Sequence, residues 1–263
     1  MIEEKLFAII GDGPGGLAVA KALRDCNIEY IQFEADNDLG GNWYHGVYET
    51  VHIISSKKTT EFSDFPMPES YPDFPSGQQM LDYLRHFAEQ FNLRENIQFN
   101  SNVTAVRPRE DGLWDVQING KDWRIFKGVI VCNGHHWDRR YPQYAGQFDG
   151  EVLHAKDYKS PDQLRNKNVL VIGGGNSACD IASEAARVGK TSAISLRRGY
   201  RFLPKTIFGT PLTEIWSTSW PLWAQRLTLH ALLQITVGDY RKFGLPKPDH
   251  KIFEKHPTVN SEL

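Results

Sequence analysis

The chain has 263 residues, of which 24% are charged and 40% are hydrophobic, and its formal net charge is −2. Because acidic and basic residues are interspersed and nearly balanced, the composition argues against nucleic acid or an anionic membrane surface as a partner. The three cysteines, Cys26, Cys132 and Cys179, form no C-x-x-C pair, so we expect no disulfide framework, zinc site or thiol redox pair.

Residues 5–34 follow the order strand, glycine-rich loop, helix and strand. Residues 6–10 are an apolar run, typical of a strand buried on both faces of a parallel sheet. The next six residues satisfy G-x-G-x-x-G, residues 17–23 have apolar side chains at helical spacing, and residues 30–34 predict a second strand ending in an acid. This order predicts a dinucleotide-binding unit rather than an accidental glycine loop. Because the first strand begins directly after residue 5, no room is left for a signal peptide, and we expect a cytoplasmic protein.

Each glycine of the G-x-G-x-x-G pattern has a physical role in the predicted site. Gly11 permits the tight turn, Gly13 lets a pyrophosphate approach the backbone, and Gly16 lets the helix pack closely on the strand. The free N–H groups at the helix N-terminus would face the phosphates. Glu34 lies where its carboxylate can accept hydrogen bonds from both hydroxyls of an adenosine ribose, and where it would repel a 2′-phosphate.

A further glycine-rich loop, residues 38–43, carries Trp43. The tryptophan either plugs a turn or lies near the ring system of a bound cofactor. Residues 48–75 are polar and rich in proline, and their phenylalanines favour an ordered covering over a disordered loop. Ser76 is expected to cap a helix with one apolar face. That face comprises Met80, Leu81, Leu84, Phe87, Ala88 and Phe91.

Three short strands predict an antiparallel meander inserted into an otherwise parallel fold. They span residues 102–107, 113–118 and 122–126, and Asn119-Gly120 supplies a hairpin turn between the last two. Residues 128–132 predict another buried strand, which is followed by Asn133 and Gly134.

The opening pattern recurs from residue 168. Residues 168–172 predict a strand, residues 173–178 fit G-x-G-x-x-A, residues 179–187 have helical spacing, and residues 192–196 predict the next strand. When Gly173 is aligned with Gly11, Leu196 takes the place of Glu34, and Arg197 and Arg198 follow at once. The two arginines suit a 2′-phosphate, although without the motif upstream they would indicate only a solvated strand end.

Beyond residue 200 the periodicity weakens. Pro221 and Arg226 interrupt an aromatic run at helical spacing, so the run does not predict a membrane span. It is either a face packed on a neighbouring domain or a membrane-touching or substrate-access surface. The run consists of Trp216, Trp220, Trp223 and Leu227.

The predicted fold is α/β, with two Rossmann-like dinucleotide-binding domains. We place the first at residues 1–165, with the meander at about 102–126, and the second at residues 166–263. Only two parallel strands of the second fold precede residue 263, whereas a mononucleotide-binding unit needs a third. We therefore expect the second domain to be incomplete. Disulfide reductases also carry two such motifs, but they need a redox cysteine pair, which this sequence lacks.

Residues 148–158 resemble the F-x-G-x-x-x-H-x-x-x-[YF] fingerprint of the flavin-containing monooxygenases, the class B flavoprotein monooxygenases. The matching positions are Phe148, Gly150, His154 and Tyr158, and they lie just before the second glycine motif, as in that family. Tyrosine at the last position resembles the branch that oxygenates nitrogen and sulfur, whereas the Baeyer–Villiger branch typically has tryptophan there. Residues 40–43, 62–66, 173–180 and 202–205 are also similar to the family.

The resemblance implies FAD in the first site and NADPH in the second. NADPH would pass hydride to the flavin, oxygen would add at flavin C4a, and the peroxide would transfer one oxygen atom to a soft nucleophile. The implied partners are a small-molecule substrate and molecular oxygen; a homo-oligomer is left open, and no metal-ligand spacing is present. The implied cofactor-binding residues are Gly11, Gly13, Pro14, Gly15, Gly16, Glu34, Gly41, Asn42, Trp43, Gly134, Gly173, Gly175, Asn176, Ser177, Ala178, Arg197 and Arg198.

One position departs from the family pattern. Ile54 occupies the place where the family usually has an active-site asparagine, and Ser55 is adjacent. Isoleucine cannot hydrogen-bond to the flavin peroxide or to NADP⁺. This departure and the missing third strand leave two alternatives open: a relative that releases hydrogen peroxide, and a non-catalytic nucleotide-binding fragment.

Overall fold

The computed structural model describes residues 2–215, 220–238, 242, 244–255 and 257–260, with side chains from Leu6 onward. The chain forms two compact units. The first unit comprises Met1–Val51, Phe62–Phe65 and Ser76–Lys156, and the second comprises His52–Glu61, Pro66–Pro75 and Asp157–Leu263. Both units combine strands with helices, which confirms the predicted α/β class.

The first unit is built on a six-stranded sheet. Its strands are β1 (Ile2–Ile10), β2 (Tyr30–Phe33), β3 (Ile97–Gln98), β4 (Val103–Pro108), β5 (Trp114–Ile118) and β6 (Asp122–Val131), and their order is β3-β2-β1-β6-β5-β4. β1 pairs in parallel with β2 and β6, so Ile10 lies opposite both Phe33 and Val131. The parallel strands β1, β2 and β6 therefore end at the same edge of the sheet. At this edge β1 leads directly into the first glycine loop.

β6 is longer than the sequence predicts. We expected separate strands at residues 122–126 and 128–132, and this was wrong, because one strand runs from Asp122 to Val131. Residues from Asp122 to Phe126 pair antiparallel with β5, and residues from Ile125 to Val131 pair parallel with β1. A Cβ on Gly128 would lie 2.7 Å from the Phe7 ring, so this glycine allows the close approach of β6 to β1. The meander is thus continuous with the main sheet.

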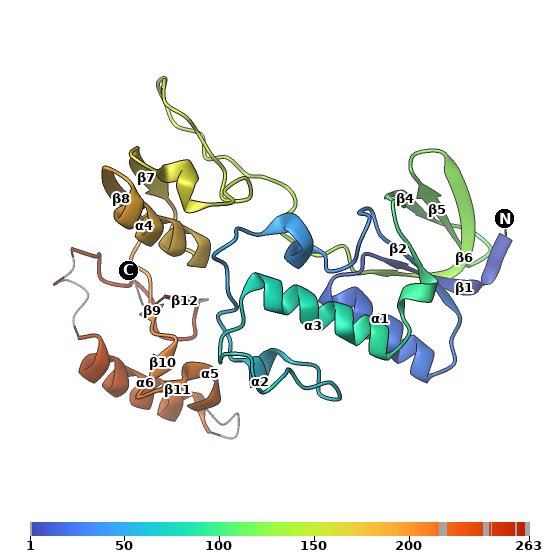
Figure 1. Cartoon of the computed structure of the whole chain (residues 1–263), viewed down its shortest axis with the longest axis horizontal. Coiled ribbons are helices and arrows are strands. Elements are labelled where there is room, and N and C mark those ends of the chain that lie inside the picture. Colours follow the sequence, from blue (N-terminus) through green and yellow to red (C-terminus); the bar gives the residue numbers. More distant parts are fainter. Residues whose placement is uncertain (1, 216–219, 239–241, 243, 256, 261–263) are drawn as a thin grey trace. The chain divides into compact units, whose positions relative to one another are not determined.

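Helices α1 (Pro14–Asp25) and α3 (Gly77–Gln90) lie side by side in the first unit (Figure 1). Ser76 caps α3 as predicted. Its hydroxyl accepts a hydrogen bond from Gln79 N–H at 3.3 Å, and the Gln79 side chain accepts one from Ser76 N–H at 2.9 Å. This reciprocal pair satisfies two N–H groups at the start of the helix.

The 48–75 segment supplies the expected aromatic covering at two positions. Phe62 and Phe65 pack on Tyr83 of α3, with ring centroids 5.8 and 5.5 Å apart. The Tyr83 hydroxyl accepts a hydrogen bond from Phe62 N–H and donates one to the Phe65 carbonyl. These contacts confirm that this part of the segment is an ordered covering.

The second unit contains the predicted second strand–loop–helix–strand repeat. β7 (Asn168–Ile172) pairs in parallel with β8 (Thr191–Ser195), and α4 (Asn176–Val188) packs on both strands (Figure 1). A separate apolar cluster contains Leu203, Leu229 and Leu233. The other elements of the chain are η1 (Asn42–Gly46), α2 (Lys57–Thr60), η2 (Arg94–Asn96), η3 (Pro161–Leu164), β9 (Phe202–Leu203), β10 (Thr206–Ile207), β11 (Thr210–Pro211), α5 (Leu212–Ile215), α6 (Leu222–Thr236) and β12 (Thr258–Val259).

The aromatic run beyond residue 215 is not one helical face. Trp216 lies outside the described residues, and Pro221 is the N-cap of α6, so Trp220 precedes that helix. Trp223 is 70% exposed, while Leu229 and Leu233 of the same helix are buried. Trp223 therefore lies outside the buried face of α6. Among the described helices, none is long and apolar enough to cross a membrane.

Candidate functional site

The first glycine loop joins β1 to α1 and tolerates no side chain at two positions. Gly11 has φ +93°, and a Cβ there would lie 2.5 Å from the Cys132 carbonyl oxygen. A Cβ on Gly16 would collide with the Gly11 carbonyl oxygen. These two contacts agree with the turn and packing roles assigned to the glycines from the sequence.

The N-terminus of α1 is open toward a ligand. Gly13 is the N-cap and Pro14 is the first helical residue, and among the described residues no side chain caps this end. A Cβ on Gly15 would meet no described atom within 4 Å. Uncapped N–H groups with the positive end of the helix dipole favour an anionic group such as a pyrophosphate.

The 40–43 loop passes against the first glycine loop. Gly41 has φ +56°, and a Cβ there would lie 3.0 Å from the Gly13 Cα. Asn42 donates a hydrogen bond from Nδ2 to the His135 carbonyl at 3.0 Å, just after Gly134. The structure therefore brings the predicted residues at 11–16, 41–42 and 134 together, while the half-buried Trp43 is the second residue of the single turn η1.

Glu34 directly follows β2 beside this loop and is 8% exposed. One carboxylate oxygen accepts the Asp12 N–H at 3.0 Å and the other accepts the Asp36 N–H at 2.9 Å. The backbone thus fixes the orientation of the predicted ribose-binding acid.

Asp12 was not predicted, because the G-x-G-x-x-G pattern leaves its position unspecified. Its side chain is fully buried, and Oδ1 accepts the Gly40 N–H at 3.3 Å. Burial, together with the neighbouring Glu34, raises the pKa of Asp12 from 3.8 to about 9. The only sequence signal was an acid inside a loop expected to bind phosphates.

The second glycine loop joins β7 to α4 in the same way. Gly173 has φ +134°, and Gly175 is the N-cap of α4, where no described side chain forms a cap. A Cβ on Gly174 would lie 2.5 Å from the Tyr200 ring, so this tyrosine covers the loop. Ser177 and Ala178 lie in the first turn of α4, because this helix begins at Asn176 and not at the predicted residue 179.

Residues near the end of the described chain brace the second loop. The Thr258 hydroxyl donates to the Gly174 carbonyl at 2.6 Å, and Val259 N–H donates to Asn176 Oδ1 at 2.8 Å. Asn260 Nδ2 donates to Asp180 Oδ1 at 2.8 Å. Asn176, which we assigned to the cofactor, therefore also serves a structural contact that sequence spacing did not indicate.

The two arginines after β8 differ in their surroundings. Arg197 is exposed, whereas Arg198 is half-buried and stacks its guanidinium over the Tyr200 ring at 5.5 Å. Because Tyr200 lies over Gly174, Arg198 stands beside the second glycine loop.

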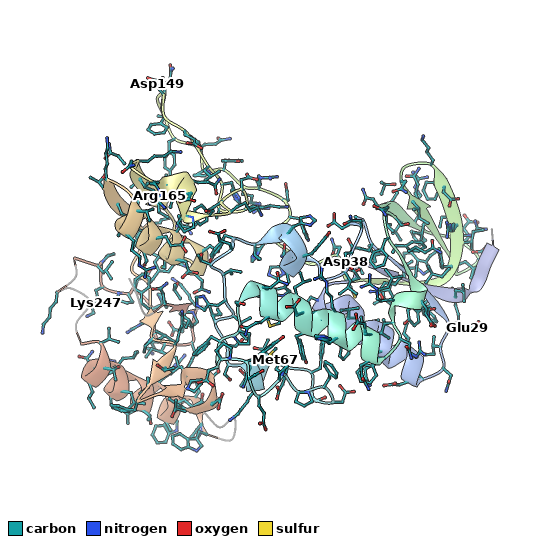
Figure 2. All side chains as sticks on the ribbon, in the orientation of Figure 1. Glu29, Asp38, Met67, Asp149, Arg165 and Lys247 are labelled. Carbon is teal, nitrogen blue, oxygen red and sulfur yellow. The ribbon has the colours of Figure 1, made fainter. Side chains whose placement is uncertain are left out.

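The fingerprint residues are divided between the two units. Phe148 folds its ring over Gly150, and the neighbouring Asp149 lies at the tip of a long exposed loop (Figure 2). His154 accepts the Lys156 N–H at Nδ1, 3.1 Å away. Tyr158 is instead buried in the second unit, where its hydroxyl donates to the Glu184 carboxylate of α4.

Ile54 and Ser55 lie in the second unit, and both are half-buried. The Ser55 hydroxyl pairs with the Thr60 hydroxyl at 2.7 Å. Among the described residues, no group of three or more His, Cys, Asp or Glu side chains could hold a metal ion.

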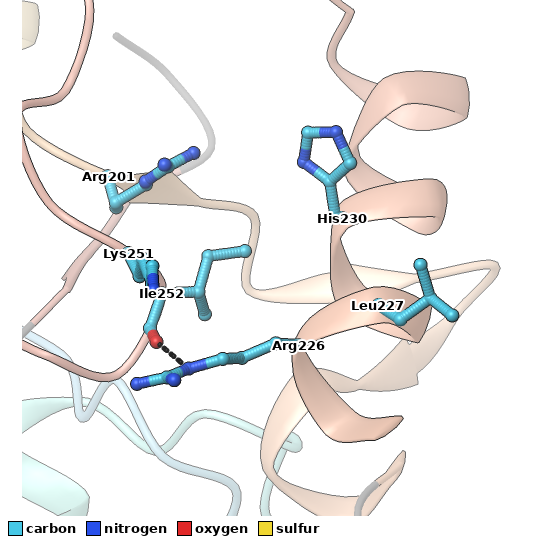
Figure 3. Close-up of a pocket in the computed structure, with 6 residues that line it drawn as sticks. All are labelled: Arg201, Arg226, Leu227, His230, Lys251 and Ile252. Atoms are coloured by element: carbon cyan, nitrogen blue, oxygen red, sulfur yellow. Dashed lines mark hydrogen bonds between the residues drawn. The ribbon is translucent and has the colours of Figure 1, made fainter. Parts of the chain in front are cut away.

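A hollow of about 320 Å³ in the second unit was not predicted from the sequence (Figure 3). Arg226 of α6 donates to the Ile252 carbonyl at 2.8 Å, and Arg201 donates to the His250 carbonyl at 2.9 Å. These guanidinium groups hold the 250–252 segment in place. The lining residues are Arg201, Arg226, Leu227, His230, Lys251 and Ile252.

Comparison with known proteins gives consistent matches. A family model described as flavin-binding monooxygenase-like matches residues 4–263. Flavin-containing monooxygenase 5 of Oryctolagus cuniculus is 34% identical over 98% of this chain and 54% of its own length, so the chain spans about half of that relative. The structure is similar to S-allyl-L-cysteine S-oxygenase of Allium sativum, with 27% identity, 75% of this chain and 52% of the other covered, and a TM-score of 0.68. It is also similar to OTEMO in complex with FAD and NADP, with 25% identity, coverages of 75% and 40%, and a TM-score of 0.65.

Proposed function

Because this chain belongs to the flavin-binding monooxygenase-like family, we propose that it binds FAD and NADPH and serves the oxygenation of a soft nitrogen or sulfur atom in a small molecule. The observation that carries the proposal is the pair of open glycine loops, with an acid after one and arginines after the other.

FAD fits the first loop. A pyrophosphate at the uncapped N-terminus of α1 would lie against Gly13, which, like the neighbouring Gly41, carries no side chain to obstruct it. Glu34 has its carboxylate fixed by two backbone N–H groups, so it can accept hydrogen bonds from ribose hydroxyls with little reorganisation.

NADPH fits the second loop. The N-terminus of α4 is open at Gly175, and the exposed Arg197 lies one residue beyond Leu196, which takes the place of Glu34 after β8. A guanidinium binds a 2′-phosphate well because its planar fork can donate to two oxygens. When bound, the flavin would supply the family chemistry, accepting hydride from NADPH and activating oxygen at C4a.

The proposal is tested by loading the protein with FAD and titrating it with NADPH without oxygen. Bleaching of the flavin absorbance, followed by one sulfoxide formed per NADPH when oxygen and a simple thioether are added, is the expected result. A protein that takes up no flavin, or a bound flavin that NADPH cannot reduce, would overturn it.

A second candidate is release of hydrogen peroxide instead of oxygen transfer. Ile54 offers no hydrogen bond, and the adjacent Ser55 hydroxyl is already paired with Thr60. In this case peroxide, not sulfoxide, would account for the NADPH consumed. Ile54→Asn should then raise the share of sulfoxide, whereas Ser55→Ala should leave it unchanged.

A further inference from the structure

Two buried carboxyl groups stand side by side at the first glycine loop. Asp12 is 0% exposed and Glu34 is 8% exposed, and Glu34 accepts the Asp12 N–H at 3.0 Å. The charged groups that act on Asp12 are Glu34 and Asp38, both acids. Asp38 is itself bound by Arg85 and Arg94, at 2.8 and 3.0 Å, so the charge that most affects Asp12 is that of Glu34.

The two carboxyl groups differ in the hydrogen bonds that they accept. Glu34 receives two backbone N–H groups, one on each oxygen, and such donors stabilise the charged form. Asp12 receives only the Gly40 N–H, on Oδ1, while no described N–H or O–H group reaches its buried Oδ2. This pattern fits a neutral acid in which Oδ1 is the carbonyl oxygen and Oδ2 is the hydroxyl oxygen.

Binding of a pyrophosphate also favours a neutral Asp12 over an ionised one. Asp12 lies between Gly11 and Gly13 in a loop that would bind a pyrophosphate, and a second negative charge there would oppose that binding. A neutral carboxyl group leaves the loop compatible with phosphate and gives Glu34 one more hydrogen-bond donor.

We propose that Asp12 is a neutral carboxylic acid that donates a hydrogen bond to Glu34 and thereby positions the Glu34 carboxylate for the ribose of FAD. This inference rests on the assignment of FAD to the first glycine loop. Asp12 acts through Glu34, so it is a positioning residue rather than a cofactor ligand.

The protonation state is measured directly on the 263-residue chain without FAD, by carbon-13 NMR of aspartate carboxyl groups. One resonance should stay at the protonated position at neutral pH, titrate near pH 9, and vanish in Asp12→Asn. Asp111 is the internal control, because Arg109 lowers its pKa and it should be ionised throughout. If every aspartate resonance of the wild-type chain has the chemical shift of an ionised carboxylate at neutral pH, the inference is wrong, whatever the FAD result.

The positioning role is measured as the dissociation constant of FAD against pH, from quenching of flavin fluorescence. The wild type should bind FAD constantly at neutral pH and lose affinity above about pH 9. Asp12→Ala should weaken binding by roughly ten- to a hundredfold at neutral pH, whereas Asp12→Asn, whose amide still donates, should restore it and abolish the alkaline loss. If both variants weakened FAD binding equally and the pH profile were unchanged, Asp12 would only fill space at the loop, and the positioning role would be wrong. Absence of FAD binding at any pH would instead refute the proposed function while the NMR result stands.

Discussion

At the scale of single residues, charge separates the two nucleotide loops. Glu34 is buried and held by backbone N–H groups, whereas Arg197 is exposed, so the ends of β2 and β8 present opposite signs. The residue types were predictable because the two strand–loop–helix repeats align. The roles of Asp12 and Asn176 were not, because each depends on a partner distant in sequence, Gly40 for one and Val259 for the other.

Arg197→Ala tests the assignment of the 2′-phosphate. A lost charge-assisted hydrogen bond should raise the KM for NADPH by roughly ten- to a hundredfold and change the KM for NADH little. Anaerobic flavin reduction by each nucleotide measures this. Arg165→Ala is the matched control, since Arg165 is exposed and pairs with Asp162. If Arg197→Ala raised the KM for NADH as much as the KM for NADPH, the assignment would be contradicted.

Asp12 should also make stability depend on pH. Its pKa is about 9 in the folded state against an ordinary value of 3.8, so between these values the folded chain binds more protons than the unfolded chain. The free energy of unfolding should therefore fall as pH rises through this window. Asp12→Asn should flatten the slope and be more stable than the wild type by about 1–3 kcal/mol at mildly alkaline pH. Urea unfolding across the window measures this, and a slope unchanged from wild type would exclude Asp12 as its source.

At the scale of elements, local patterns located the strands and helices but not where they continue or stop. Apolar runs on both sides of Lys127 and Gly128 resembled two strands, because a glycine that relieves a clash with Phe7 looks in sequence like a boundary. The capping box at Ser76 was predictable, since both of its partners lie within one turn. Tyr158 was recognisable from its motif, yet its bond to α4 depends on tertiary packing.

Tyr158→Phe tests whether the last fingerprint residue anchors α4. The change removes a hydrogen bond from the buried Glu184 carboxylate and should lower the stability of the second unit by about 1–3 kcal/mol. Adding Glu184→Gln should recover part of this loss, because a neutral amide costs less to bury than a carboxylate. Tyr141→Phe, at an exposed tyrosine, is the control. If thermal unfolding of Tyr158→Phe matches that of the control, the bond contributes nothing to stability.

At the scale of the whole molecule, two similar repeats occur in one chain, and among the described residues the second repeat belongs to a smaller sheet than the first. β7 and β8 form a two-stranded parallel sheet, whereas parallel sheets in α/β proteins are normally covered on both faces. α4 packs on this sheet, yet Leu170 and Ile172 of β7 are 62% and 51% exposed. The alternation along β7 therefore leaves one apolar face toward solvent.

That face should make the 263-residue chain associate with itself. Burying an aliphatic side chain contributes about 1.5–3 kcal/mol, so contacts through Leu170 and Ile172 favour association by roughly tenfold or more for each side chain. Leu170→Thr combined with Ile172→Thr should shift sedimentation velocity profiles toward the monomer with little loss of thermal stability, since threonine suits an exposed strand position. Val171→Thr is the matched control on the half-buried face of the same strand, and it should lower stability without reducing association. A wild-type chain that stays monomeric at every concentration would show that the exposed face of β7 is not adhesive.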